Sequence, residues 1–240
     1  MKLPVGEIVT VAIIVVLGAV NLAIYTGVLD GFDPVRAGRA VDLPPGNAPV
    51  VPSSGEDAAN DASPALPGRF VPSQGGRHTP PWPLDDDARV PFCGEGEIDN
   101  DCYASNPPTS GLHLPVTRDA RLASGDVIDL PPPAGVYDFE IPREAIPHWQ
   151  EHGGVYVGYR CGSNACLQLV EDLTRLVQDQ IAAGRRVVMA PSSDLSEDTL
   201  AAASWTRVDI MTLAEYSRER VRQFIEAHSC RYDPENLCPE

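Results

Sequence analysis

The chain has 240 residues, of which 34 are Asp or Glu and 18 are Lys or Arg, so its formal net charge at pH 7 is −16. A chain this acidic repels phosphate backbones, which excludes nucleic-acid binding. The 24 Pro and 20 Gly together make up more of the chain than the usual combined share of about 12 %, so part of the chain is not expected to pack. The length allows one ordinary domain with appendages.

An apolar segment runs from residue 8 to residue 28 and carries no formal charge. A helix of this length crosses the hydrocarbon layer of about 30 Å. A cleaved signal peptide is the alternative, but its apolar region is usually about 7–15 residues long and ends in a small-x-small site. Neither feature is clear here, so we expect a transmembrane signal anchor over residues 1–29, with the membrane as the partner of residues 8–28.

The cysteines indicate the orientation of this anchor better than the flanking charges, which give only a weak positive-inside bias. All six Cys lie after residue 90, which is typical of a part that is exported to an oxidising compartment. We therefore expect a single-pass protein of the cell membrane with a cytoplasmic N-terminus and an extracytoplasmic C-terminal domain.

Residues 30–91 are expected to form a Pro-rich disordered linker. They show almost no periodic apolar pattern, so they cannot bury enough surface to offset the entropy of ordering. The segment either holds the next domain away from the bilayer or is a tolerated connection without a role, and its composition does not separate the two.

Residues 92–240 have the composition of a globular domain. The stretch 93–133 is rich in turn residues and is predicted to be mainly loop, and 142–151 predicts a short, proline-interrupted helical turn. Later patterns predict strands over 154–160, 185–190 and 204–211 and amphipathic helices over 167–183 and 213–228. The order indicates an α/β or α+β domain with a small sheet, two amphipathic helices and a loop-rich N-terminal half.

The six cysteines fall in three close pairs. Disulfides between nearest neighbours are the expected pairing, although six cysteines permit many others. Thiolate metal binding is the alternative, but none of the spacings is the C-x-x-C of a zinc ribbon. The expected pairs are Cys93 with Cys102, Cys161 with Cys166, and Cys230 with Cys238.

Three of the five histidines are candidate metal ligands. His148 and His152 are four residues apart, so on a helix they share one face and could hold one ion. His113 follows a turn containing Gly that could deliver a third imidazole. The alternative is that these are ordinary surface or core histidines, whereas His78, in the predicted linker, and His228 are expected to be dispensable.

The metal hypothesis involves two further residues. Copper or zinc would be the ion, Glu151 would orient an imidazole without touching the metal, and Met189 could add a soft ligand for Cu(I). Residues 148–152 also match H-x-x-E-H, the inverted zinc-peptidase signature with Glu151 as general base. Pro147 and Gly153 leave a host helix of barely a turn and a half, so a zinc hydrolase is the least favoured alternative. No nucleophile or nucleotide-binding motif occurs, and we do not expect an enzyme otherwise.

Several blocks resemble the bacterial family called domain of unknown function 3105, over about residues 100–228. They are PPTSG-x-H at 107–113, GVY at 135–137, H-x-x-E-H-G at 148–153 and the strand at 187–191. The chain departs from the family at Leu112, where members usually have Pro, and at Gln150, where they usually have Leu. The resemblance implies a single-span or exported protein with a Pro-rich tether and implies no reaction. It also weakens the hydrolase hypothesis, because the H-x-x-E-H match is partly the family's own H-x-L-E-H-G block.

Three functions remain open. The first is an extracytoplasmic copper- or zinc-binding module, the second a structural or assembly subunit of a larger membrane complex, and the third a zinc hydrolase. In the second, the PPTSG and EHG blocks are turns that specify the fold, and the histidines bond to the backbone. If the three histidines share an ion, their ligand nitrogens must converge within about 5 Å.

Overall fold

The computed structural model describes residues 62–238. The expected anchor at residues 1–29 and residues 30–61 of the expected linker lie outside the described residues. In the part that is described, no helix combines the length and apolar character needed to cross a membrane.

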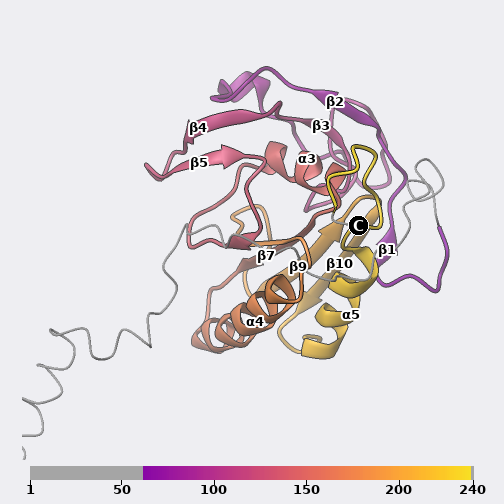
Figure 1. Cartoon of the computed structure of the whole chain (residues 1–240), viewed down its shortest axis with the longest axis vertical. Coiled ribbons are helices and arrows are strands. Elements are labelled where there is room, and N and C mark those ends of the chain that lie inside the picture. The colour runs from indigo at the N-terminus through magenta and orange to yellow at the C-terminus, as the bar shows by residue number, and fades with distance from the viewer. Residues whose placement is uncertain (1–61, 239–240) are drawn as a thin grey trace, which may run out of the picture. The chain divides into compact units, whose positions relative to one another are not determined.

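A six-stranded mixed sheet forms the middle of the domain (Figure 1), with the order β1-β10-β9-β7-β8-β6. β8 is parallel to β7 and β6, and the remaining neighbours are antiparallel. The parallel pairing of β7 with β8 follows from the helix between them, which returns the chain to the same end of the sheet. The strands are β1 (Arg69–Phe70), β6 (Gly135–Val136), β7 (Val155–Arg160), β8 (Val187–Pro191), β9 (Thr199–Ser204) and β10 (Arg207–Thr212).

Two helices cover one face of this sheet (Figure 1), α4 (Asn164–Ala182) and α5 (Arg218–His228). The side chain of Ser163 caps α4 by accepting from the backbone N–H of Cys166, and Ser217 caps α5 in the same way. Alternate strand residues, among them Val155 and Val157, pack against the apolar faces of these helices. The two predicted amphipathic helices are confirmed, although the second begins at Arg218 and not at residue 213.

The opposite face is covered by short elements. Tyr156 and Val188 point to this side and pack in a second core with Trp149 and Leu114. The elements are η2 (Asp86–Ala88), η3 (Arg143–Ala145), α3 (Ile146–Glu151), the pair β2 (Gly76–His78) with β3 (Gly111–His113), and the pair β4 (Thr117–Arg121) with β5 (Val127–Leu130). The described chain is therefore a mixed α+β fold, as the sequence predicts.

Two further predicted boundaries differ from the structure. Most of the strand expected over 204–211 is β10, but Ser204 ends β9, because the chain turns at Trp205 and Thr206, whose φ is 62°. β9, the hairpin partner of β10, was not predicted. Residues 62–91 were expected to be linker, but they contain β1, β2 and η2, and Val71 is only 2 % exposed. Strands β1 and β2 are held by hydrogen bonds to β10 and β3. They are too short to show a periodic apolar pattern, so the sequence does not reveal them.

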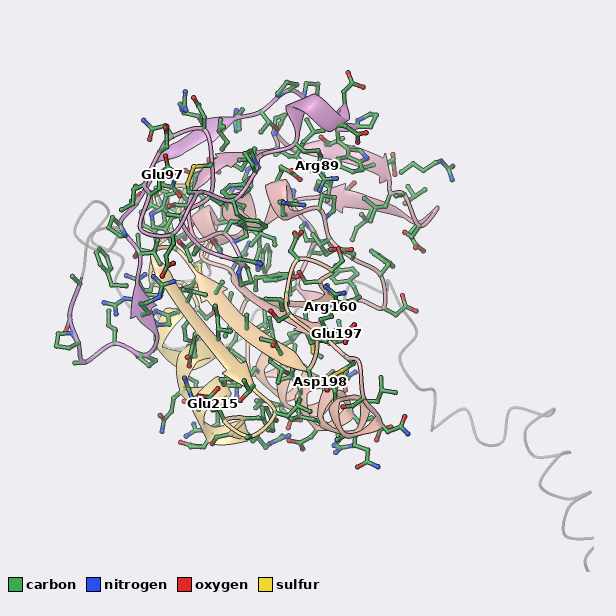
Figure 2. The ribbon with its side chains drawn as sticks, turned by 180° about the vertical axis from the view of Figure 1, so that it is seen from behind. Arg89, Glu97, Arg160, Glu197, Asp198 and Glu215 are labelled. Carbon is green, nitrogen blue, oxygen red and sulfur yellow. A yellow bond between two sulfur atoms is a disulfide. The ribbon has the colours of Figure 1, made fainter. Side chains whose placement is uncertain are left out.

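The three disulfides confirm the nearest-neighbour prediction. Their Cα–Cα distances are 5.0, 5.3 and 6.0 Å for Cys93–Cys102, Cys161–Cys166 and Cys230–Cys238. No cysteine of the described residues is free, so thiolate metal binding has no ligand there. The first bond closes the loop that carries Glu97, at the edge of the domain (Figure 2).

Candidate metal centre

Three histidine side chains converge where the β2–β3 pair meets α3. His78 ends β2, His113 ends β3, and His148 belongs to α3. Each offers one ring nitrogen, and the three nitrogens lie within 4.8 Å of one another, close enough to share one ion. His113 and His148 are buried whereas His78 is exposed, so the cluster has one side that faces solvent.

The pairing of two strands places the first two histidines side by side. β2 runs parallel to β3 with Gly76 opposite Gly111 and His78 opposite His113. Paired residues of adjacent strands point to the same side of a sheet, and the two rings are accordingly 5.0 Å apart between centroids. The same G-x-H pattern thus occurs in both strands.

Gly76 allows this strand to approach α3. A Cβ atom at Gly76 would lie 2.6 Å from Oε1 of Glu151 and 3.2 Å from Cε1 of His113. Gly111 has a φ of 107°, a conformation that side chains rarely adopt. Both glycines are therefore part of the geometry that brings the histidines together.

Hydrogen bonds fix which nitrogen of each buried histidine can bind a metal. Nδ1 of His113 lies 3.0 Å from the carbonyl oxygen of Gly111, and Nδ1 of His148 lies 2.6 Å from that of Leu114. A carbonyl only accepts, so each Nδ1 carries the proton and donates it. The Nε2 atoms of the two neutral rings therefore keep their lone pairs, and backbone carbonyls behind ligand histidines are the usual support of metal sites.

Burial keeps these two imidazoles neutral. Desolvation lowers the pKa of His113 to about 4 against the opposing hydrogen bond to Gly111, and the neighbouring histidines lower it further. Burial also lowers the pKa of His148. Metal binding requires the neutral form, so both rings are in the binding form at neutral pH.

Glu151 lies beside the cluster rather than in it. Its Oε2 atom is 3.3 Å from Nε2 of His113, and its side chain is 19 % exposed. Burial, followed by the charge of Glu235, raises the pKa of this carboxyl. Because Nε2 of His113 holds a lone pair, two acceptors face each other unless a proton or a cation lies between them. A bound cation would relieve this repulsion.

His152 is not one of the three convergent histidines. α3 ends at Glu151, so His152 follows as its C-cap, and its ring lies edge-on to His148 with 4.5 Å between centroids. Its Nε2 atom is 3.1 Å from Oε2 of Glu235, without hydrogen-bond geometry. The predicted set of His113, His148 and His152 thus shares two members with the observed set, and His78 is the third. The helix ends before the second histidine of H-x-x-E-H, so the two histidines do not lie on one full helix as the peptidase signature requires.

The remaining candidates lie elsewhere. Met189 is fully buried in the core under α4, where the hydroxyl of Thr174 contacts its sulfur at 4.0 Å. His228 is buried and its Nε2 lies 2.9 Å from the carbonyl oxygen of Pro67. His78 was not among the predicted ligands because it lies in the predicted linker. The repeated G-x-H of residues 76–78 and 111–113 is the signal that could have found it.

Comparison with known proteins gives one match. The model of a family described as "Protein of unknown function (DUF3105)" matches residues 122–240. No curated protein and no solved structure matches the chain. The matched residues include α3 and the EHG block but begin after β3. His78 and His113 therefore lie outside them, as does the PPTSG block.

Proposed function

Because residues 122–240 belong to the DUF3105 family, whose description assigns no activity, we propose a function from the site itself. The domain binds one copper or zinc ion through His78, His113 and His148. The observation that carries this proposal is the convergence of three ligand nitrogens within 4.8 Å. Two of the rings also donate Nδ1–H to the backbone, which leaves Nε2 for the ion.

The donor set favours these two metals over others. Neutral imidazoles suit zinc and copper, whereas magnesium and calcium take oxygen ligands. Three histidines with one side open to solvent leave a coordination position for water or for an exchanging partner. Glu151 adds a negative charge next to Nε2 of His113, where it would stabilise a bound cation.

The proposed location is the outer face of a membrane, with the chain anchored by residues 8–28. The three disulfides support an oxidising compartment, and the length of the apolar segment supports the anchor. In this position the module would hold a metal ion for exchange with other extracytoplasmic components.

A test separates ligand loss from loss of fold. Asn at position 113 or 148 can still donate to the backbone carbonyl, because its amide nitrogen lies near the place of Nδ1, but it has no Nε2. The full chain, freed of metal by a chelator, is titrated with Zn²⁺ and Cu²⁺ by calorimetry. We expect one ion per wild-type chain and no measurable binding by His113→Asn or His148→Asn at unchanged melting temperature. Absence of binding by the wild type would refute the metal site and favour the structural subunit.

A further inference from the structure

A nine-residue loop closed by the Cys230–Cys238 disulfide packs on the end of α3. The backbone N–H of Cys230 donates to the carbonyl of Gly153 at 2.8 Å. Gly153 has a φ of 77°, and a Cβ atom there would lie 2.6 Å from Sγ of Cys238. The disulfide is therefore in direct contact with the residue that follows His152.

Hydrogen bonds within the loop and from Arg186 hold its backbone, which fixes the place of Glu235. The carboxylate of Asp233 accepts from the backbone N–H groups of Leu237 at 3.0 Å and Cys238 at 2.7 Å. Arg186 donates to the carbonyl of Leu237 at 3.3 Å. Glu235, between these anchors, holds Oε2 at 3.1 Å from Nε2 of His152.

His152 connects Glu235 to the histidine cluster. The buried Nε2 atom of His152 has no hydrogen-bond partner in the described chain, and Oε2 of Glu235 lies 3.1 Å from it. The ring of His152 packs edge-on against His148. The charge of Glu235 also reaches the site: it opposes the burial that lowers the pKa of His148, and it adds to the burial that raises the pKa of Glu151. The Glu235 carboxylate is therefore placed to hold His152 against His148, one of the proposed ligands, and to add negative charge near it.

We propose that Glu235 is a positioning residue of the three-histidine site and that the Cys230–Cys238 bond makes metal affinity depend on redox state. This inference rests on the proposed function. A dithiol reductant would break the S–S bond, leaving two thiols on the chain and one disulfide in the reductant, with two electrons and two protons transferred. The opened loop gains conformational freedom, Glu235 leaves His152, and the site loses charge and support.

The chain provides a matched control for this disulfide. The control is the Cys161–Cys166 disulfide. In both disulfides one cysteine is buried, Cys166 or Cys230, and the other is partly exposed, Cys161 or Cys238. The Cys161–Cys166 loop is bound by Asp198, which accepts from the backbone of Gly162 and Ser163. Figure 2 shows Asp198 near α4, away from the part of the molecule that carries Glu97. Removal of the Cys161–Cys166 disulfide should therefore leave the three histidines in place.

The experiment measures zinc affinity of the full chain by calorimetry for the wild type, Glu235→Gln, Cys230→Ser/Cys238→Ser and Cys161→Ser/Cys166→Ser. Loss of an outer partner of a ligand typically weakens metal binding about 10–100-fold. We expect a loss of about tenfold for Glu235→Gln and for the first double variant, and none for the second. Glu235→Gln should leave the melting temperature of the metal-free protein unchanged, because the pair is half-exposed on the Glu235 side.

Three results decide the matter. Wild-type affinity in Glu235→Gln overturns the inference while leaving the metal site intact, and so does an equal loss in both double variants. If the wild type binds no metal, the proposed function is refuted and this inference with it. Glu235→Gln keeps the disulfide, so it remains decisive even if the Cys230→Ser/Cys238→Ser chain does not fold.

Discussion

The two faces of the central sheet are built in different ways. The face under α4 and α5 is closed by long helices whose apolar residues recur along the chain and pack into one continuous core. The face under α3 and the β2–β3 pair consists of short elements held by strand pairing, backbone hydrogen bonds to histidines and a disulfide loop. All residues of the proposed metal site lie on the second face.

The two faces differ in what stabilises them. A periodic apolar face gains free energy from burial and needs no particular partner atom. The histidine face instead places polar groups at defined positions, and it does so with residues that are far apart in sequence. If the two faces are separable in this sense, a substitution on one face should leave the property of the other unchanged.

The largest effect is expected from Leu173→Ala, on the helix side. Leu173 is fully buried, and truncation of such a leucine costs about 2–5 kcal/mol of unfolding free energy. Urea denaturation should show this loss, while the zinc affinity of the folded protein should match that of the wild type. A weakened zinc affinity at low denaturant would show that the two faces are coupled.

His148→Asn should give the reverse pattern. Zinc affinity should fall by more than about 100-fold, a larger loss than that from an outer-sphere residue. The melting temperature should stay near the wild-type value, because the Asn amide can still donate to Leu114. His148→Ala should also lower stability, by about 1–3 kcal/mol, since the buried carbonyl loses its donor. Equal melting temperatures for the two variants would contradict this role of Nδ1.

A third prediction concerns the pH dependence of the metal-free chain. The pKa of His113 is about 4 when folded and about 6.5 when unfolded, so between these values the unfolded state binds the proton preferentially. Stability should therefore be complete above about pH 6.5 and decline as the pH falls toward 4, by about 2–3 kcal/mol. Denaturation at several pH values should show a smaller decline for His113→Asn. Parallel curves for the two proteins would refute the assignment.

The smallest effect is expected at Gly76. A methyl group there would push Glu151 away from His113, and we expect Gly76→Ala to weaken zinc binding about tenfold. Gly75→Ala is its control, because a Cβ atom at Gly75 meets nothing within 4 Å but the φ of 73° is unfavourable. That variant should lose about 1 kcal/mol of stability and keep its affinity. The reversed outcome for the two glycines would exclude a role of Glu151 in the site.

The same contrast explains what the sequence could predict. Helices α4 and α5 and strands β7 and β8 follow from local periodicity, which is a property of each segment alone. β1 has only two residues and pairs with β10, whose partner residue Val208 is far along the chain from Arg69, so no local pattern identifies it. His78 was missed for the same reason, whereas His113 was found because it follows a turn containing Gly, and His148 because it is four residues from His152.

The paired G-x-H strands also have a consequence for folding energetics. His78, His113 and His148 come from three separate segments, so an unfolded chain does not present a preformed site. An ion bound only by the folded state would add about 2.7 kcal/mol of stability when its free concentration is one hundred times its dissociation constant. Such an ion would act as a reversible cross-link between the β2–β3 pair and α3. The attachment of β2 to the rest of the domain would then depend on the supply of metal.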